Sequence, residues 1–176
     1  MLDPTMNYTC GYWPNANPLE AAQVAKMDLV FRKVGLEPGD RVLDIGRGWG
    51  SLMKYAADTY DVSCVGVTVS EEQKALGEEH CGGLPIEFRL TDYRDVTGTF
   101  DHIVSIGMFE HVGPKNYRTF FKKWMSVLPT EGCSCWTPSA IGSPTTPPTP
   151  SRRSTSFRTG SFPPSSRSAR PPSACW

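Results

Sequence analysis

Three glycines at alternate positions, preceded by an acidic residue, form the strongest chemical signal in the sequence. They lie in the segment Asp44-Ile45-Gly46-Arg47-Gly48-Trp49-Gly50. Glycines let the backbone pass close to a ligand, and a helix that begins after such a loop presents free N–H groups. Dinucleotide sites prefer G-x-G-x-x-G, whose third glycine would stand one position beyond Gly50. The spacing favours an adenosyl ligand without a pyrophosphate, with Asp44 supporting the loop or meeting a ligand ammonium; a tight turn without a ligand is the alternative.

Polar residues also follow the next two predicted strands. The segment Thr68-Val69-Ser70-Glu71-Glu72-Gln73 comes after the second strand, where nucleoside sites of this fold often hold ribose hydroxyls with an acid. The two glutamates could serve, although first-turn acids are more simply helix-dipole partners, and the threonine hydroxyl and glutamine amide are alternatives. The segment Thr91-Asp92-Tyr93-Arg94 follows the third strand. It could bind and flank an adenine, or form a solvated turn.

A fourth segment combines an acid with an imidazole. Gly107-Met108-Phe109-Glu110-His111-Val112-Gly113 follows the fourth predicted strand. In open α/β sheets, ligands bind at the carboxyl edge of the strands. Glu110 and His111 beside apolar side chains at that edge therefore indicate chemistry rather than packing.

Alternating helices and strands must position these segments. Apolar residues at helical spacing predict helices over Leu19–Val34, Ser51–Tyr60 and Asn116–Leu128. Ser70 and Gln73 have the spacing of a capping box, which predicts a further helix start. Short apolar runs predict strands over 41–46, 62–69, 86–90 and 100–106. The last helix is expected to place five residues on its core side, namely Tyr117, Phe120, Phe121, Trp124 and Leu128. The predicted class is α/β, with a doubly wound, mainly parallel sheet.

The composition changes abruptly near Gly132. All 18 acidic residues lie in 1–132 together with 13 of the 18 basic ones, whereas the last 44 residues hold 9 of the 16 prolines and no Asp, Glu or Lys. The zero net charge of the whole chain argues against a nucleic-acid binder with a basic surface. No apolar run approaches ~18 residues, and the N-terminus lacks the pattern of a signal peptide, so neither a transmembrane segment nor a leader is expected.

The six cysteines do not form a recognisable framework. Cys133 and Cys135 make a C-x-C, and the other four are far apart. A zinc site would need C-x-x-C or histidines at ligand spacing, which His80, His102 and His111 do not supply. No metal site is expected, and a reducing, cytosolic setting is the default.

Four strings together carry a resemblance to one family. They are Tyr8-Thr9-Cys10-Gly11-Tyr12-Trp13, Leu19-Glu20-x-Ala22-Gln23-x-Ala25-Lys26, Val42-Leu43-Asp44-Ile45-Gly46-x-Gly48-Trp49-Gly50 and Gly107-Met108-Phe109-Glu110-His111-Val112-Gly113-Pro114-Lys115-Asn116-Tyr117. They resemble the catalytic domain of the cyclopropane-fatty-acyl-phospholipid synthases, S-adenosylmethionine-dependent enzymes related to the mycolic acid cyclopropane synthases. The resemblance runs through residues 1–132 and implies a class I methyltransferase, Rossmann-like fold.

The resemblance also implies a reaction. The family methylenates a cis double bond in an acyl chain of an unsaturated phospholipid at a membrane surface, so the expected location is the cytoplasm, peripheral at the inner membrane face. A bound bicarbonate is implied as the base, held partly by Cys10 and Glu110. The implied cofactor contacts are Tyr8, Thr9, the Val42–Gly50 loop with Arg47, Thr68 to Gln73, Tyr93 and Arg94. Another lipid or small-molecule methyltransferase, or a non-catalytic relic, are the alternatives.

Two departures from the family pattern stand out. The family usually has Cys where this chain has Arg47, and a bulky cation beside a sulfonium ligand is unfavourable unless it points to solvent. The family also continues beyond Gly132 with an apolar strand and a T-I-G segment that holds further bicarbonate ligands. This chain has Cys133-Ser134-Cys135-Trp136-Thr137-Pro138 there instead.

A one-base deletion at Gly132 explains the second departure. Reading the last base of each codon with the first two of the next permits V-L-L-L-D-T-I-G from Gly132 onwards. Over Pro148–Pro164 it permits D-P-F-T-E-K-Y-I-F-P-N-G-V-L-P-S, against D-P-W-x-x-K-Y-I-F-P-N-G-x-L-P-S in the family. A genuine disordered Pro/Ser-rich tail is the alternative. Residues 133–176 are therefore interpreted as out-of-frame translation. We expect strands five to seven to be absent, an open edge on the fourth strand, low stability and little activity.

Overall fold

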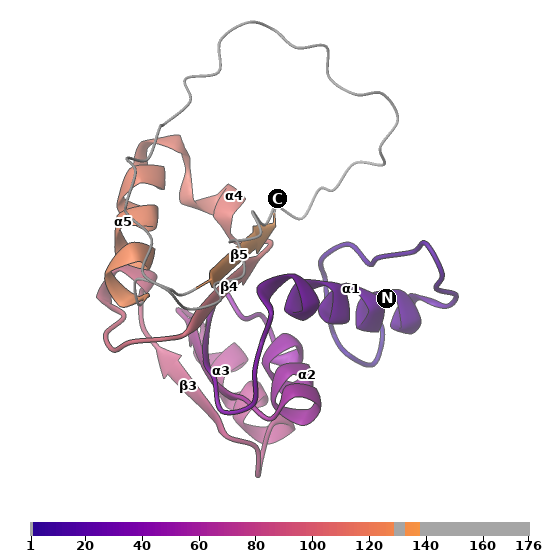
Figure 1. The fold of residues 1–176 in the computed structure, drawn as a ribbon. Coiled ribbons are helices and arrows are strands. Elements are labelled where there is room, and N and C mark those ends of the chain that lie inside the picture. Colours follow the sequence, from indigo (N-terminus) through magenta and orange to yellow (C-terminus); the bar gives the residue numbers. More distant parts are fainter. Residues whose placement is uncertain (1, 129–132, 138–176) are drawn as a thin grey trace, which may run out of the picture. The chain divides into compact units, whose positions relative to one another are not determined.

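A parallel sheet organises the described residues, which are 2–128 and 133–137 of this computed structural model. The strands run in the order β3-β2-β1-β4-β5 (Figure 1). Their bounds are β1 Arg41–Ile45, β2 Ser63–Thr68, β3 Ile86–Leu90, β4 His102–Ile106 and β5 Cys133–Thr137. Because β1 is paired with both β2 and β4, the strand order reverses at β1. A crevice at the carboxyl ends of the strands is expected at such a reversal.

The helices confirm the predicted alternation with the strands. Their bounds are α1 Leu19–Val34, α2 Ser51–Tyr60, α3 Glu71–His80, α4 Phe109–Val112 and α5 Tyr117–Val127, with 3-10 turns at Tyr93–Asp95 and Pro114–Asn116. Helix α4 was not predicted, because four residues are too few to display helical periodicity. In the described part of the chain, no helix is long and apolar enough to cross a membrane.

Helices cover both faces of the sheet, and the alternation of side chains along each strand divides the core accordingly. On one face, Val42 and Cys64 pack with side chains of α1 and α2. On the other, Leu43 and Val65 pack with Phe120 and other side chains of α4 and α5. Both faces of the strands are therefore buried, as expected for a parallel sheet.

Local signals set the helix boundaries at two positions that matter for the site. Gly35 ends α1 in the left-handed region at φ 75°, where its N–H donates to Phe31 O. Ser70 Oγ caps α3 by accepting from Gln73 N at 3.2 Å, which confirms half of the capping box. The Gln73 side chain instead accepts from Thr68 Oγ1 at 2.7 Å, so it turns toward the end of β2.

The expected absence of a fifth strand is wrong, and so is the open edge that it would leave on β4. Cys133–Thr137 forms β5 and pairs in parallel with β4 along its whole length, from His102 opposite Cys133 to Ile106 opposite Thr137. The ladder uses backbone N–H and C=O groups, which any non-proline sequence supplies, so a strand can form there whatever the reading frame. The Pro/Ser-rich tail beyond residue 137 lies outside the described residues.

The core side of α5 was largely predicted correctly. Phe120 and Trp124 are buried, and Tyr117 and Leu128 pack against the same cluster. Phe121 is 37% exposed, so its placement on the core side is wrong. It lies at the margin of the cluster, with its ring centroid 5.3 Å from that of Phe109.

The adjacent phenylalanines of α5 give a matched test of this packing. Phe120→Ala should lower the free energy of unfolding by about 3–5 kcal/mol, because Phe120 has no exposed surface and its removal leaves a cavity. Phe121→Ala should cost less than half as much. Urea unfolding followed by circular dichroism measures both, and equal losses would contradict the core assignment.

Candidate functional site

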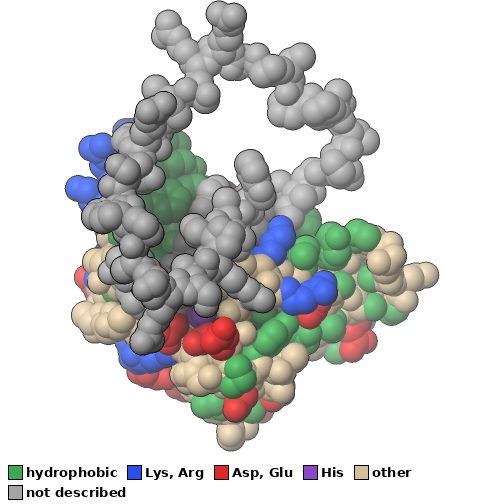
Figure 2. Space-filling model, in the orientation of Figure 1, with side chains coloured by type: hydrophobic (Ala, Val, Ile, Leu, Met, Phe, Trp, Pro, Cys, Tyr) green, Lys and Arg blue, Asp and Glu red, His purple; other side chains and the backbone are tan. Residues whose placement is uncertain are grey.

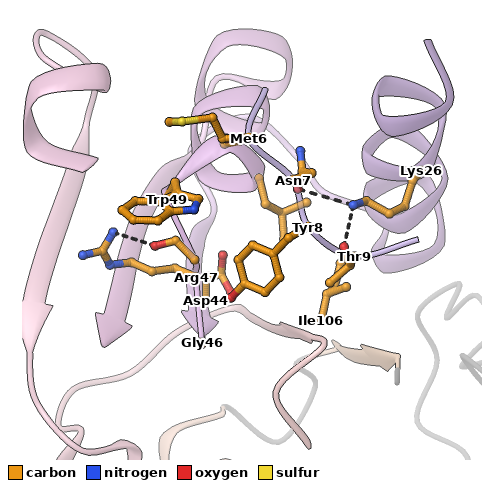
Figure 3. Close-up of a pocket in the computed structure, with 13 residues that line it drawn as sticks. Met6, Asn7, Tyr8, Thr9, Lys26, Asp44, Gly46, Arg47, Trp49 and Ile106 are labelled. Atoms are coloured by element: carbon orange, nitrogen blue, oxygen red, sulfur yellow. Dashed lines mark hydrogen bonds between the residues drawn. The ribbon is translucent and has the colours of Figure 1, made fainter. Parts of the chain in front are cut away.

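Two cavities lie at the carboxyl edge of the sheet. The larger, which we call the crevice, has a volume of about 340 Å³. It is lined by Tyr8, Ile45, Gly46, Val67, Thr68, Val69, Gln73, Thr91, Asp92, Tyr93, Gly107, Met108 and His111. The smaller, the loop cavity (Figure 3), is lined by Met6, Asn7, Tyr8, Thr9, Lys26, Asp44, Gly46, Arg47, Gly48, Trp49, Ser51, Leu52 and Ile106. Tyr8 and Gly46 line both, so the two cavities adjoin.

The glycine loop needs glycine at two of its positions for close packing. Gly46 has φ 86°, and a Cβ there would lie 2.5 Å from Met108 Cβ. Gly48 has φ 55°, and a Cβ there would lie 3.0 Å from the Tyr8 ring. The loop therefore brings the end of β1 against the segment after β4 and against the N-terminal segment. The close approach that these glycines allow is to Met108 and Tyr8. Their approach to a ligand stays a prediction.

Asp44 is the only described aspartate or glutamate that lines the loop cavity. It is 2% exposed, and its Oδ2 has no hydrogen-bond partner. Burial raises the pKa of this carboxyl to about 7, against the opposing effect of the Arg47 charge. In Figure 3 the ring of Tyr8 projects toward this carboxyl. A ligand that brings an N–H or ammonium group into the loop cavity would satisfy Asp44, which fits an aminoacyl group.

A cation at position 47 would be compatible with a sulfonium ligand if its side chain pointed to solvent. The Arg47 side chain does not point to solvent. It is 4% exposed, and its guanidinium lies 4.2 Å from the centroid of the Phe88 ring. A Cβ on Gly77 of α3 would lie 2.7 Å from Arg47 Nη1, so the side chain runs beneath that helix. Nη1 donates to Gly48 O at 3.5 Å, and Nε and Nη2 have no partner. Burial lowers the pKa of the guanidinium.

The residues after β2 divide between the crevice and the helix cap. Thr68, Val69 and Gln73 line the crevice, whereas Ser70, Glu71 and Glu72 do not. Ser70 caps α3, and the two glutamates are exposed in its first turn. Hydroxyl and amide groups, not carboxylates, therefore face the crevice at this point.

The residues after β3 divide in a similar way. Tyr93 lines the crevice together with Thr91 and Asp92, and its ring packs edge-on against Phe120, 5.0 Å between centroids. Arg94 lines neither cavity. It is exposed and pairs with Asp92 through Nη2–Oδ2 at 2.7 Å and Nε–Oδ1 at 2.9 Å. The arginine therefore orients the aspartate at the rim of the crevice.

Five other candidate residues line neither of the two cavities, and one of them, Gly50, is the residue that precedes α2. Cys10 and Glu110 are exposed, the latter in the first turn of α4, and neither is among the residues lining the crevice or the loop cavity. Val42 and Leu43 are buried inside β1. Their side chains pack in the core and so stabilise the strand that carries the glycine loop.

Sequence reasoning missed Asn7 and Lys26 as site residues. Lys26 is 9% exposed and Asn7 partly buried, and both line the loop cavity. A signal was present, because Gln23 and Lys26 interrupt the apolar face of a predicted helix at a spacing of three, which places both on one side. Polar side chains on a buried helix face need partners, and here those partners belong to the N-terminal segment.

Together, the parallel sheet, the strand reversal at β1 and the glycine loop define the fold of the class I methyltransferases. The solved structure of mycolic acid cyclopropane synthase CmaA1 complexed with SAH and CTAB superposes with a TM-score of 0.73 at 38% identity, covering 76% of this chain and 48% of that one. A structure of coclaurine N-methyltransferase bound to N-methylheliamine and SAH gives 0.71 at 29% identity, covering 76% of this chain and 41% of that one.

The sequence comparisons define the family more narrowly. The family model for mycolic acid cyclopropane synthetase matches residues 1–163, so the chain belongs to that family. It is 58% identical over 132 residues to the cyclopropane-fatty-acyl-phospholipid synthase of Escherichia coli K12, covering 75% of this chain but 35% of that protein. It is 41% identical over 143 residues to cyclopropane mycolic acid synthase 2 of Mycobacterium bovis, covering 74% of this chain and 47% of that one. The chain thus spans between a third and a half of the length of these relatives.

The raised pKa of Asp44 predicts an unusual pH dependence of stability. A carboxyl with a folded pKa of about 7 and an ordinary value of 3.8 binds a proton more tightly when folded, so its contribution falls as pH rises between these values. Since one pKa unit corresponds to ~1.4 kcal/mol, the unfolding free energy of the wild type relative to Asp44→Asn should decrease by ~4 kcal/mol from pH 4 to pH 8. Urea titrations at each pH measure it.

Asp92→Asn is the matched control. Hydrogen bonds from Arg94 lower the pKa of Asp92. The stability that the Asp92 carboxylate contributes is therefore fully present above the ordinary pKa of an aspartate and is lost only at lower pH. The wild type relative to Asp92→Asn should show no decrease between pH 4 and pH 8. A parallel decline for both variants would contradict the assignment to Asp44.

Arg47 gives a second stability prediction. Arg47→Met should raise the free energy of unfolding by ~1–3 kcal/mol, since it removes two buried donors without partners but keeps a chain that can pack on Phe88. Arg118→Met, at an exposed position of α5, should change it by less than ~0.5 kcal/mol. Destabilisation by Arg47→Met would show that the guanidinium stabilises the fold.

Proposed function

We propose that the complete protein transfers a methylene group from S-adenosylmethionine to a cis double bond of an unsaturated phospholipid acyl chain, producing a cyclopropane fatty acid. The observation that carries this is the crevice beside the glycine loop, which adjoins a buried carboxylate without a donor. The family match and the 58% identity to a cyclopropane-fatty-acyl-phospholipid synthase support the same reaction.

Residues of the two cavities fit the parts of the cofactor. The bound cofactor would supply the one-carbon unit from its sulfonium. Asp44 would accept from its ammonium, Thr68 and Gln73 would hydrogen-bond its ribose hydroxyls, and Tyr93 would flank its adenine. Gly46 and Gly48 would let the loop approach closely, and Tyr8 would exclude water from above.

An enzyme that acts on a phospholipid must bind a membrane surface. The proposed location is the inner face of the membrane, which the protein would reach from the cytoplasm. Hydrophobic side chains gather over α1 and the N-terminal segment on the face in Figure 2. The large exposed ones in this region are Leu2, Tyr8, Tyr12, Trp13 and Val24. Tyrosine and tryptophan favour the interface between lipid and water, so this surface supports the proposed location.

The described residues do not fit a bicarbonate site. Cys10 and Glu110, the two ligands that the resemblance implies, are exposed and line neither cavity. The T-I-G segment of the family is absent from the chain as translated. We therefore assign no proton transfer to bicarbonate in this chain.

We also propose that residues 133–176 are the product of a one-base deletion at Gly132. The alignment to the Escherichia coli relative covers 132 residues, the length of the family-like part. The family model extends its match to residue 163 of the chain as it stands, so that match is independent of the shifted frame. The proposal rests on the family-like strings that the shifted frame permits over Pro148–Pro164. Sequencing the gene across the Gly132 codon tests the proposal. An open frame of unrelated sequence, with no deletion when compared with a sister strain, would overturn it.

The function is tested with two proteins. The chain of 176 residues should bind S-adenosylmethionine in calorimetry but form no cyclopropane ring on vesicles of unsaturated phospholipid. The protein translated from the restored frame should form the ring, detected as a 14-Da gain in the acyl chain by mass spectrometry together with loss of the olefinic proton signals and appearance of cyclopropane ring protons by NMR. Methylation without ring closure, or of another substrate, would favour a different methyltransferase. Absence of cofactor binding by both proteins would contradict the proposal.

A further inference from the structure

An irregular segment, Thr5 to Cys10, lies over the glycine loop, and we call it the strap. Tyr8 at its centre contacts the loop at Gly48 and lines both cavities. The strap has no regular secondary structure. Its position therefore depends on side chains that reach it from elsewhere in the fold.

Lys26 of α1 supplies two of these contacts and makes a third hydrogen bond within α1. Its Nζ donates to Thr9 Oγ1 at 2.7 Å, to Gln23 Oε1 at 2.6 Å and to Asn7 Oδ1 at 3.3 Å. Figure 3 shows the ammonium between Asn7 and Thr9, on either side of Tyr8 in the sequence. An ammonium has three protons, and all three have acceptors here. Lys26 therefore has no donor left for a ligand in the loop cavity, and its role is to hold the strap.

Gln23, one turn earlier on α1, holds the backbone of the same segment. Its Nε2 donates to Thr9 O at 2.9 Å and to Asn7 O at 3.4 Å, while its Oε1 accepts from Lys26. The side chain is 2% exposed. A backbone carbonyl in an irregular segment otherwise depends on water, so this amide replaces solvent with a fixed partner.

The strap is fixed at a second point by α2. Ser51 Oγ donates to Thr5 O, and Asn7 Nδ2 donates to Thr5 Oγ1 at 2.9 Å. The segment from Thr5 to Thr9 is thus held from α2 at one end and from α1 at the other. Tyr8 lies between these two points and contributes no hydrogen bond of its own among the described residues.

Burying Lys26 is energetically unfavourable for the fold. Desolvation lowers its pKa to about 8, although the charges of Asp3 and Cys10 oppose this effect. An apolar side chain at this position would avoid the desolvation. The contacts that the ammonium makes, rather than burial itself, account for a lysine at this position.

We propose that Lys26 and Gln23 are positioning residues that hold Tyr8 over the glycine loop and so shape the cofactor cavity. This rests on the proposed function for the identity of the cofactor. The proposal goes beyond that function because it assigns an effect on binding affinity to two side chains of α1 that act on Tyr8 through Asn7 and Thr9.

The test compares Lys26→Met with Lys33→Met, an exposed position on the same helix, in the chain of 176 residues. Lys26→Met should weaken S-adenosylmethionine binding at least tenfold by calorimetry, and Lys33→Met less than twofold. In a Tyr8→Ala background, where the ring is already missing, Lys26→Met should weaken binding less than threefold further. Unchanged affinity in Lys26→Met, or full additivity with Tyr8→Ala, would overturn the proposal.

A readout without cofactor separates this proposal from the proposed function. Chymotrypsin cleavage after Tyr8, followed by mass spectrometry, should be at least tenfold faster in Lys26→Met than in Lys33→Met, because the strap opens more often. If no protein binds S-adenosylmethionine but cleavage accelerates, the proposed function fails and the strap assignment stands. If Lys26→Met does not fold, Thr9→Val removes the opposite acceptor and should give the same acceleration. Equal cleavage rates in all folded variants would contradict the assignment.

Discussion

The pairing of β1 with strands on both sides is the constraint on which the rest of the structure depends. Since β2 and β4 both run parallel to β1, their carboxyl ends meet at one edge, and the chain leaves that edge in opposite directions. Gly46 continues from β1, and Met108 lies against it from the segment after β4. The crevice is the space that results from this divergence. The residues that line the crevice lie at the ends of the strands, in the segments that follow them or, in the case of Tyr8, in the strap.

Three ionisable groups are buried around the glycine loop, and they differ in how well they are satisfied. Lys26 has an acceptor for each of its protons, whereas Arg47 has one long hydrogen bond and an aromatic ring. Asp44 Oδ2 has no partner. Functional sites commonly combine satisfied groups that set geometry with unsatisfied groups that await a ligand. Under the proposed function, Lys26 and Asp44 would take these two roles, while Arg47 would take neither.

The strand β5 illustrates what a sheet edge requires of its sequence. Residues 133–137 pair with β4 although we interpret their sequence as out-of-frame translation. Hydrogen bonding along a parallel edge depends on backbone groups, so many different sequences can form a strand there. A catalytic segment is not permissive, because its function depends on particular side chains, and the T-I-G of the family is absent.

Much of the fold was determined by local sequence. Apolar spacing predicted α1 and α2 at the observed boundaries, and Ser70 predicted the start of α3, because these signals act within a few residues. The tertiary structure alone decided the direction of Arg47, the convergence of Lys26 with Asn7 and Thr9, and the exposure of Cys10 and Glu110. These features join residues distant in sequence, or depend on which space the packed core leaves free. Periodicity and spacing carry no information about either, because they describe only neighbours along the chain.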